Sequence, residues 1–179
     1  IGPLGIPWWL PLILLIVGGN DTTRNSISGG VVALNEYPNE YQKLRDNPAL
    51  IPNMVSEIIR WQTPLAYMRR TATRDTELAG RRIAKGDKVV LWYVSANRDE
   101  DVFDDPFAFR IDRDPNPHLG FGVGEHFCLG AGLARMEIRV FLDQLAARLQ
   151  SVELGDDPKR TAASFVGGFK HLPLRWTLT

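Results

Sequence analysis

A single cysteine, placed in a glycine-rich loop directly before a predicted helix, constrains this chain more than any other feature. Cys128 is the only cysteine among 179 residues, and it lies in the run 121–130, FGVGEHFCLG. Backbone N–H groups and the helix dipole at a helix start stabilise a thiolate over a thiol, which makes the sulfur a good metal donor. Gly122, Gly124 and Gly130 let the backbone adopt positive φ and approach a flat ligand closely. The loop therefore predicts a metal-binding thiolate.

Three other roles for Cys128 compete with metal ligation. A lone cysteine is commonly a small buried apolar residue, although the flanking glycines and His126 argue against that here. A cysteine nucleophile paired with His118, His126 or His171 stays open, but no signature of a cysteine enzyme supports it. A dinucleotide-binding fingerprint fails because Phe127 stands where its last glycine belongs and no hydrophobic strand immediately precedes the loop.

Charge and composition argue against several kinds of partner. Lys plus Arg and Asp plus Glu number 21 each, so no overall field attracts nucleic acid or an anionic membrane surface. The apolar stretch 8–17 is about half the ~20 residues of a spanning helix, so we expect no transmembrane anchor. A lone cysteine forms no internal disulfide and no secretory signal is legible, which together favour the cytoplasm.

Hydrophobic periodicity and breaker residues predict a mainly α-helical chain with a small antiparallel β region and no internal domain boundary. We expect one long, largely buried helix that begins near Pro11, and two shorter helices opened by Pro38 and Pro52. Beyond them we expect strands within 67–94 that include the run 89–94, a loop over 97–117, a last long helix from about 133 that is broken at 155–158, and short strands in the tail.

The cysteine loop resembles the heme-binding loop of the cytochrome P450 superfamily, which the pattern Phe-x-x-Gly-x-His-x-Cys-x-Gly matches in full. The resemblance covers nearly the whole chain from Leu12 onward. It implies that residues 1–179 are a partial P450 domain, the C-terminal portion of the fold without its N-terminal part. Apolar surface on the first helix and on the heme-facing loops should then lie open in this chain alone.

The resemblance implies heme b as cofactor, with the Cys128 thiolate as axial ligand of the iron. It also implies that Arg70 binds a heme propionate, with Arg69 as a competitor. Neighbouring strand residues face opposite ways, so only one of the two should reach the heme. The other expected heme contacts are His118, His126, Phe121, Gly122, Gly130, Gly18 and Gly19.

The stretch Gly18-Gly19-Asn20-Asp21-Thr22-Thr23 is locally unfavourable inside a helix. A helix kink, or a helix start capped by Asp21, would explain it without any function. The resemblance instead implies an oxygen-binding stretch, in which the glycines open space for dioxygen and Asp21 with Thr22 delivers protons.

Glu57 and Arg60 lie three residues apart on one predicted helix, close enough to pair. Such a pair is more often a solvated surface pair. The resemblance implies that it is buried and joined by Arg113, and that the trio fixes loop geometry rather than adding stability.

Separate stretches resemble two groups of hydroxylases within the superfamily. Residues 18–26 and 57–65 are similar to bacterial terminal alkane and fatty-acid hydroxylases, whereas 115–122 and 168–173 are similar to actinobacterial enzymes that hydroxylate steroid side chains and methyl-branched lipids. Both groups oxidise the end of a long apolar chain.

The resemblance thus implies a heme-thiolate monooxygenase that uses O2 and acts on the terminal carbon of an alkane, fatty acid or steroid side chain. Electrons would come ultimately from NAD(P)H, through a ferredoxin and ferredoxin reductase or a fused reductase. The segments 63–66 and 165–169 are candidate substrate walls, with ordinary core packing as the alternative. A non-catalytic heme-binding module, and behind it a cysteine hydrolase, are the alternative functions.

Overall fold

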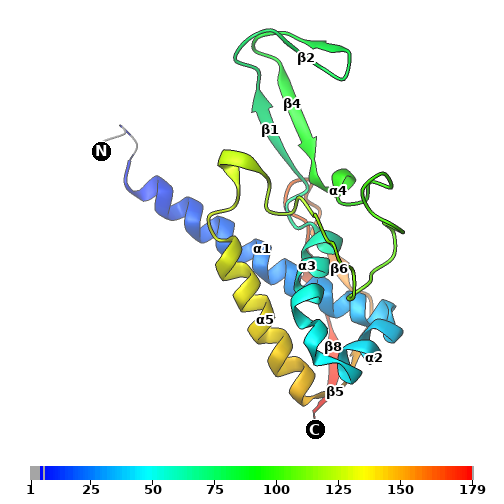
Figure 1. Ribbon diagram of the computed structural model, residues 1–179. Helices are drawn as coiled ribbons and strands as arrows, with labels where there is room; N and C mark the ends of the chain where they lie inside the picture. Colours follow the sequence, from blue (N-terminus) through cyan, green and yellow to red (C-terminus); the bar gives the residue numbers. More distant parts are fainter. Residues whose placement is uncertain (1–4, 6, 179) are drawn as a thin grey trace.

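The computed structural model describes residue 5 and residues 7–178, and within them the chain is mainly α-helical with small antiparallel sheets, as predicted (Figure 1). The helices are α1 (Trp9–Glu36), α2 (Pro38–Asp46), η1 (Pro48–Leu50), α3 (Ile51–Gln62), α4 (Tyr93–Ala96), η2 (Gly124–His126) and α5 (Ala131–Arg148). The strands are β1 (Tyr67–Thr71), β2 (Thr76–Leu78), β3 (Arg81–Ile83), β4 (Lys88–Trp92), β5 (Leu149–Leu154), β6 (Lys159–Arg160), β7 (Phe169–His171) and β8 (Leu174–Leu178).

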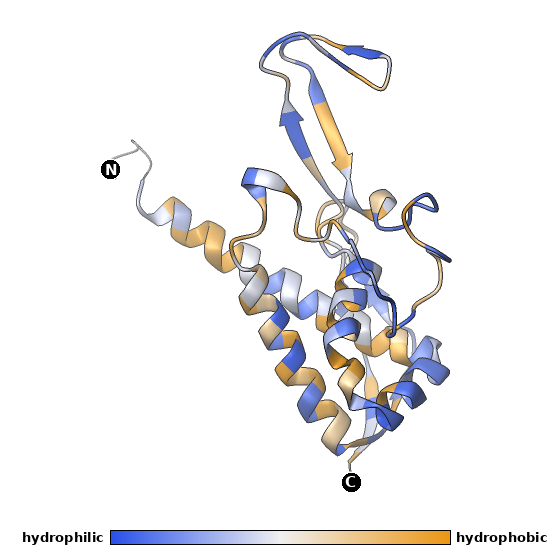
Figure 2. Ribbon diagram, viewed as in Figure 1, coloured by the Kyte–Doolittle hydropathy of each residue, from blue (hydrophilic) through white to orange (hydrophobic). Residues whose placement is uncertain are grey.

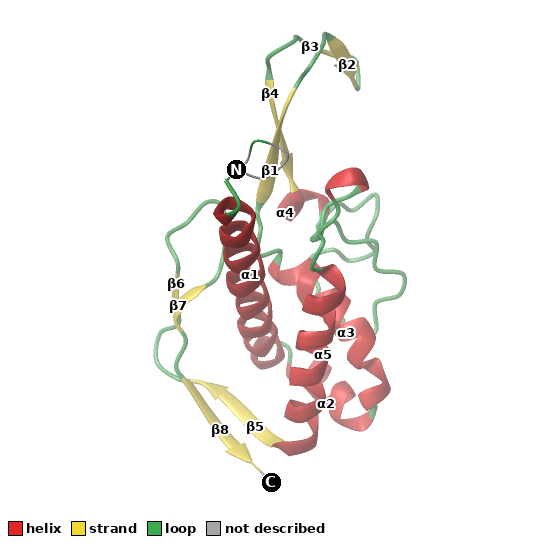
Figure 3. Cartoon of the chain, turned by 90° about the vertical axis from the view of Figure 1, so that its left-hand side faces the viewer, coloured by secondary structure: helices red, strands yellow, loops and turns green. Residues whose placement is uncertain are grey.

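The core forms where α1, α3 and α5 pack against one another (Figure 3). Helix α3 has the strongest one-sided pattern, with Met54, Val55, Ile58 and Ile59 all buried. Burial of each such side chain is worth about 1.5–3 kcal/mol. A proline stands in the first turn, as predicted, and the helix ends at Thr63, whose φ of 39° is left-handed. The three helices therefore make a rigid base for the loops that leave α3 and enter α5.

The strands form antiparallel pairs around this base. Strands β1 and β4 pair over five residues, and with β2 and β3 they form a long hairpin that projects from the helical part (Figure 1). Strand β5 pairs with β8, and β6 pairs with β7.

Two predicted boundaries are wrong. The last helix ends at Arg148, and the residues before Gly155 form β5, because tertiary hydrogen bonds bind the backbone there: Tyr41 Oη donates to the Leu149 carbonyl (3.0 Å), and the Leu154 N–H donates to Asn35 Oδ1 (3.0 Å). The predicted strand 89–94 ends at Trp92, since the chain turns there into α4.

The prediction of a largely buried first helix is wrong for its N-terminal half. Helix α1 begins at Trp9, near Pro11 as predicted, but residues 9–20 are all exposed, Leu14 by 72%. This apolar half-helix extends past the rest of the chain (Figure 2). The accessible surface of 11721 Å² exceeds the roughly 8,700 Å² expected for a folded monomer of this mass. Much apolar surface is therefore left uncovered, as the sequence predicted.

Among the described residues, no helix is long and apolar enough to cross a bilayer.

The difference between the two kinds of apolar position is testable by truncation. Ile58 is 1% exposed and Leu14 is 72% exposed. Ile58→Ala should lower the unfolding free energy of chain 1–179 by about 2–5 kcal/mol, whereas Leu14→Ala should change it by less than about 0.5 kcal/mol. Urea denaturation followed by circular dichroism measures both, and equal losses would contradict this description of the core.

Candidate functional site

Backbone hydrogen bonds within the cysteine loop hold its shape, and the Cys128 side chain is exposed. The Cys128 N–H donates to the Phe121 carbonyl (2.9 Å), which closes the loop on itself. Gly122 and Gly124 have φ of 70° and 71°, a conformation in which a side chain is strained. The interpretation of Cys128 as a buried apolar residue is therefore wrong. Gly130 has a φ of −86°, so the expectation of positive φ is wrong for this glycine.

An apolar surface surrounds the sulfur. The neighbouring loop residues Val123, Phe127 and Leu129 are exposed, Leu129 by 90%, and so is Leu133 on the first turns of α5. Cys128 stands three residues before the first residue of α5, and a Cβ added to Gly130 would lie 3.9 Å from Sγ. The thiol thus lies near a helix start, among exposed apolar side chains that could contact an apolar ligand.

Beside the loop, a hollow of about 420 Å³ combines apolar walls with two basic side chains. Arg70 of β1 and His126 of the loop are the basic residues, and Arg70 is half-buried while Arg69 is exposed. The remaining lining residues are Leu91, Trp92, Tyr93, Ala96, Leu119 and Val123. A ligand with apolar faces and an anionic edge complements this hollow.

His118 does not line that hollow but packs beneath the loop. Its Nδ1 accepts a hydrogen bond from the Gly120 N–H (3.2 Å), and its ring contacts the ring of Phe121, over which the Arg135 guanidinium lies at 4.5 Å. Burial, and then the positive charge of Arg135, lower the pKa of His118 to about 4. His118 is therefore neutral near pH 7.

Glu57, Arg60 and Arg113 meet in the interior, with exposed side-chain fractions of 0%, 0% and 5%. Arg60 Nε lies 2.7 Å and Arg113 Nε 3.3 Å from Glu57 Oε2. The interpretation of Glu57 and Arg60 as a solvated surface pair is wrong. Arg60 Nη2 also donates to Glu57 Oε1 (2.8 Å). The remaining guanidinium N–H groups donate to backbone carbonyls of the loop from α4 to the cysteine loop: Asn97, Asp104, Asp105, Pro106 and Ala108.

Helix α1 runs without a break through the glycine pair, so no helix starts at Asp21. Thr22 Oγ1 donates to the Gly18 carbonyl (2.6 Å), and Asp21 pairs with Arg24 (3.0 Å). A Cβ added to Gly18 or Gly19 would meet no atom within 4 Å, so the space beside both glycines is open.

The donor set around Cys128 fits an iron porphyrin. Among the described residues, no group of three or more His, Cys, Asp or Glu side chains is placed to hold a metal ion. A single thiolate needs a metal that brings its other ligands with it, as heme iron does. The apolar surface and the basic hollow suit the faces and the propionate edge of such a group.

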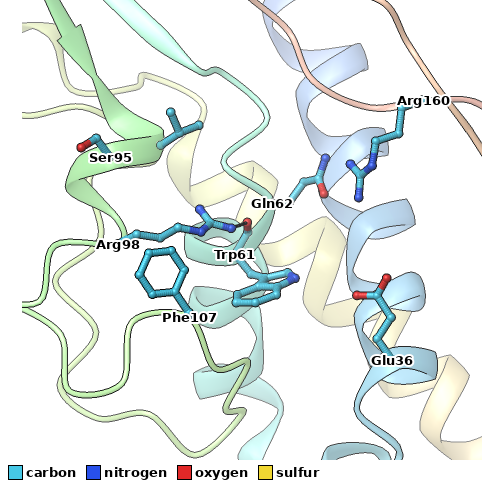
Figure 4. Close-up of a pocket in the computed structure, with 8 residues that line it drawn as sticks. Glu36, Trp61, Gln62, Ser95, Arg98, Phe107 and Arg160 are labelled. Atoms are coloured by element: carbon cyan, nitrogen blue, oxygen red, sulfur yellow. Dashed lines mark hydrogen bonds between the residues drawn. The ribbon is translucent and has the colours of Figure 1, made fainter.

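A cavity of about 610 Å³ lies elsewhere, lined by the C-terminal ends of α1 and α3, by α4 and by the loop after it (Figure 4). Arg98 crosses it, donates to the Trp61 carbonyl (2.8 Å) and lies over the Trp61 ring at 5.1 Å. None of the predicted site residues lines this cavity.

Sequence reasoning missed three residues that shape the site: Tyr93, whose Oη would lie 3.2 Å from a Cβ on Gly122; Arg135, over the Phe121 ring; and the fully buried Asn97. Tyr93 and Arg135 lie in segments predicted as regular structure, but nothing in the sequence shows that their side chains reach the cysteine loop, and Asn97 lies in a predicted loop.

Comparison with known proteins agrees with this geometry. The family model Cytochrome P450 matches residues 11–171. The methyl-branched lipid omega-hydroxylase of Mycobacterium tuberculosis is 53% identical over 167 residues, which cover 92% of this chain and 39% of that protein. The steroid C26-monooxygenase of Mycobacterium bovis is 44% identical over 170 residues, covering 93% of this chain and 38% of that protein.

Among solved structures, cytochrome P450-153 from Novosphingobium aromaticivorans is similar with a TM-score of 0.90 and 49% identity, over 93% of this chain and 42% of that one. The chain thus spans about two fifths of the length of these relatives.

The low pKa of His118 predicts how stability depends on pH. The unfolded chain protonates this imidazole near its ordinary pKa of about 6.5, but the folded chain does so only near 4. As pH falls from about 6.5 to about 4, the unfolded state binds the proton first, so the unfolding free energy should fall, by up to about 3 kcal/mol. In His118→Gln this contribution should vanish. Urea denaturation at stepped pH tests this, and an unchanged slope in the variant would contradict it.

Proposed function

The chain belongs to the cytochrome P450 family, and from that premise we propose that its parent protein is a heme-thiolate monooxygenase that hydroxylates the end of a long apolar chain. The observation that carries the proposal is the exposed Cys128 in a glycine-turned loop before α5, a loop whose His126 shares a hollow with Arg70. Bound heme b would supply dioxygen activation and the insertion of one oxygen atom into a C–H bond.

In this proposal the residues of the chain hold and orient that group. Cys128 ligates the iron, and Arg70 with His126 pairs with the propionates, for which a guanidinium fork is suited. Phe121, Gly122 and Gly130 shape the loop under the ring. His118 adds to this loop from beneath, through its contact with Phe121.

Proton delivery falls to Asp21 and Thr22. Because the Thr22 hydroxyl donates its hydrogen to the Gly18 carbonyl, its oxygen is free to accept a hydrogen bond from a molecule beside Gly18 and Gly19. Asp21 is partly exposed and pairs with Arg24, so it can exchange protons with solvent once that surface pair opens. The pair can then relay protons from solvent to the oxygen site.

The two predicted wall segments, 63–66 and 165–169, lie side by side, so their apolar residues could line one common surface for an apolar substrate. Leu65 and Val166 form an antiparallel bridge, the Ala66 N–H donates to the Phe165 carbonyl (2.9 Å), and the Gly167 N–H donates to the Pro64 carbonyl (2.8 Å). Gly168 packs against Asn25 of α1, one turn beyond Thr22. The joined segments thus offer an apolar wall near the proposed oxygen site.

For the substrate we propose a methyl-branched lipid, fatty acid, alkane or steroid side chain, oxidised at its terminal carbon. The names of the relatives support this, since they act on a methyl-branched lipid at its omega position and on a steroid at C26. We infer that electrons come from NAD(P)H through a ferredoxin and its reductase, or through a fused reductase.

The decisive experiment uses the complete parent protein. Ferrous protein with carbon monoxide should show the strongly red-shifted Soret band of thiolate-ligated heme, and a methyl-branched fatty acid with O2 and supplied electrons should yield the ω-alcohol. No Soret band would support a cysteine hydrolase instead. A thiolate-type band with no product from any apolar chain tested would leave a heme-binding module.

Thr22→Ala tests the proton-delivery role. The variant should bind heme normally but divert oxygen consumption from product to peroxide, and product per O2 consumed should fall by about 10-fold or more. The loss of a general acid relay worth roughly 10²–10⁴-fold would allow a fall of that size. Thr22→Ser, which keeps the hydroxyl, should retain most of the coupling. Wild-type coupling in Thr22→Ala would remove Thr22 from the mechanism.

A further inference from the structure

Asn97, directly after α4, joins three separate segments of the chain through hydrogen bonds. The residue is fully buried. Its backbone carbonyl accepts from Arg60 Nη1 (2.8 Å), its side-chain Nδ2 donates to Thr63 Oγ1 (2.9 Å), and its Oδ1 accepts from the Leu119 N–H (2.7 Å).

On one side Asn97 holds the turn that ends α3. Thr63 has a left-handed backbone with φ of 39°, which is unfavourable for a β-branched residue. Its hydroxyl donates to the Arg60 carbonyl (2.6 Å) and accepts from Asn97, so both hydrogen bonds stabilise this conformation. The candidate substrate wall, residues 63–66, begins at this turn.

On the other side Asn97 holds the segment that enters the cysteine loop. The Leu119 N–H donates to Asn97 Oδ1, and the Leu119 carbonyl accepts a hydrogen bond from the Gly122 N–H (2.8 Å). Further along the loop, the Phe121 carbonyl accepts a hydrogen bond from the Cys128 N–H (2.9 Å). Short backbone contacts thus lead from the amide of Asn97 to the residue that carries the sulfur.

The chemistry of the partners fixes which end of the amide faces which segment. The Leu119 N–H can only donate, so it requires the Asn97 oxygen. The Thr63 hydroxyl already donates to Arg60, so it requires the Asn97 NH2 group. A flipped or shortened side chain would leave polar groups unpaired in the interior, which is costly.

We propose that Asn97 is a positioning residue for the Cys128 thiolate, coupling the position of the sulfur to the Thr63 turn at the substrate wall. The proposal rests on the proposed function, since it concerns the ligand of the heme. Asn97 touches neither heme nor substrate in this role but acts through Leu119 and Thr63.

The test compares variants of the complete parent protein by the lifetime of the ferrous–CO thiolate band in mild urea. Asn97→Leu removes both side-chain hydrogen bonds at similar volume, and it should speed conversion to the non-thiolate form by about 10-fold or more, the usual effect of losing a supporting contact of a metal ligand. Thr63→Ala should change the rate in the same direction, and Thr63→Ser should restore it.

Asn35→Leu is the matched control. Asn35 also uses both ends of its amide: Nδ2 donates to the Val31 carbonyl (3.2 Å), and Oδ1 accepts from the Leu154 N–H (3.0 Å). These partners lie in α1 and β5, away from the cysteine loop. Asn35→Leu should lower the urea midpoint of unfolding. Its rate of conversion to the non-thiolate form should equal the wild-type rate when each protein is measured at the same urea concentration below its own midpoint.

Folded Asn97→Leu with the wild-type conversion rate, or Asn35→Leu with the same acceleration, would overturn the proposal. If Asn97→Leu does not fold, equal rates in Thr63→Ala and Thr63→Ser would overturn it. A wild-type protein without the thiolate band would instead refute the proposed function itself.

Discussion

The buried Glu57 carboxylate is the interaction on which the site depends. It serves two guanidiniums, those of Arg60 and Arg113, while the other N–H groups of both arginines lack an acidic partner among the described residues and must find backbone carbonyls. A buried ion cluster is tolerable only when every donor is satisfied. The loop from α4 to the cysteine loop supplies those carbonyls. Its path is therefore set by the hydrogen bonds that the two buried guanidiniums require, although it contains no long helix or strand.

Function follows from how this fixed loop enters the cysteine loop. The chain leaves the ion cluster, passes Asn116, whose Nδ2 donates to Glu57 (3.0 Å), and reaches Leu119 and the glycine turns. Those turns expose the Cys128 sulfur at the start of α5 instead of burying it. A rigid polar interior thus supports an open apolar surface, which suits a large planar cofactor. The exposed half of α1 carries the two open glycines, and the Asp21–Thr22 pair follows them directly.

The sequence predicted the features that have local signals. Prolines marked the starts of α2 and α3, the glycines around Cys128 predicted its turns, and the spacing of Glu57 and Arg60 predicted their contact. It failed where distant residues decide, because Asn35 and Tyr41 bind the backbone of β5 where periodicity predicted helix. For the first half of α1, periodicity predicted burial, whereas the resemblance implied the open apolar surface that the structure has. The role of Asn97 was equally invisible, since its partners come from segments 34 and 22 residues away.

The central claim is that Cys128 binds heme iron through its sulfur, and iron K-edge X-ray absorption of the ferric parent protein tests it most directly. We expect one sulfur neighbour in addition to four porphyrin nitrogens in the wild-type protein, and the loss of this sulfur in Cys128→Ser. A first shell of nitrogen and oxygen alone in the wild-type protein, or a sulfur neighbour that survives in Cys128→Ser, would contradict it.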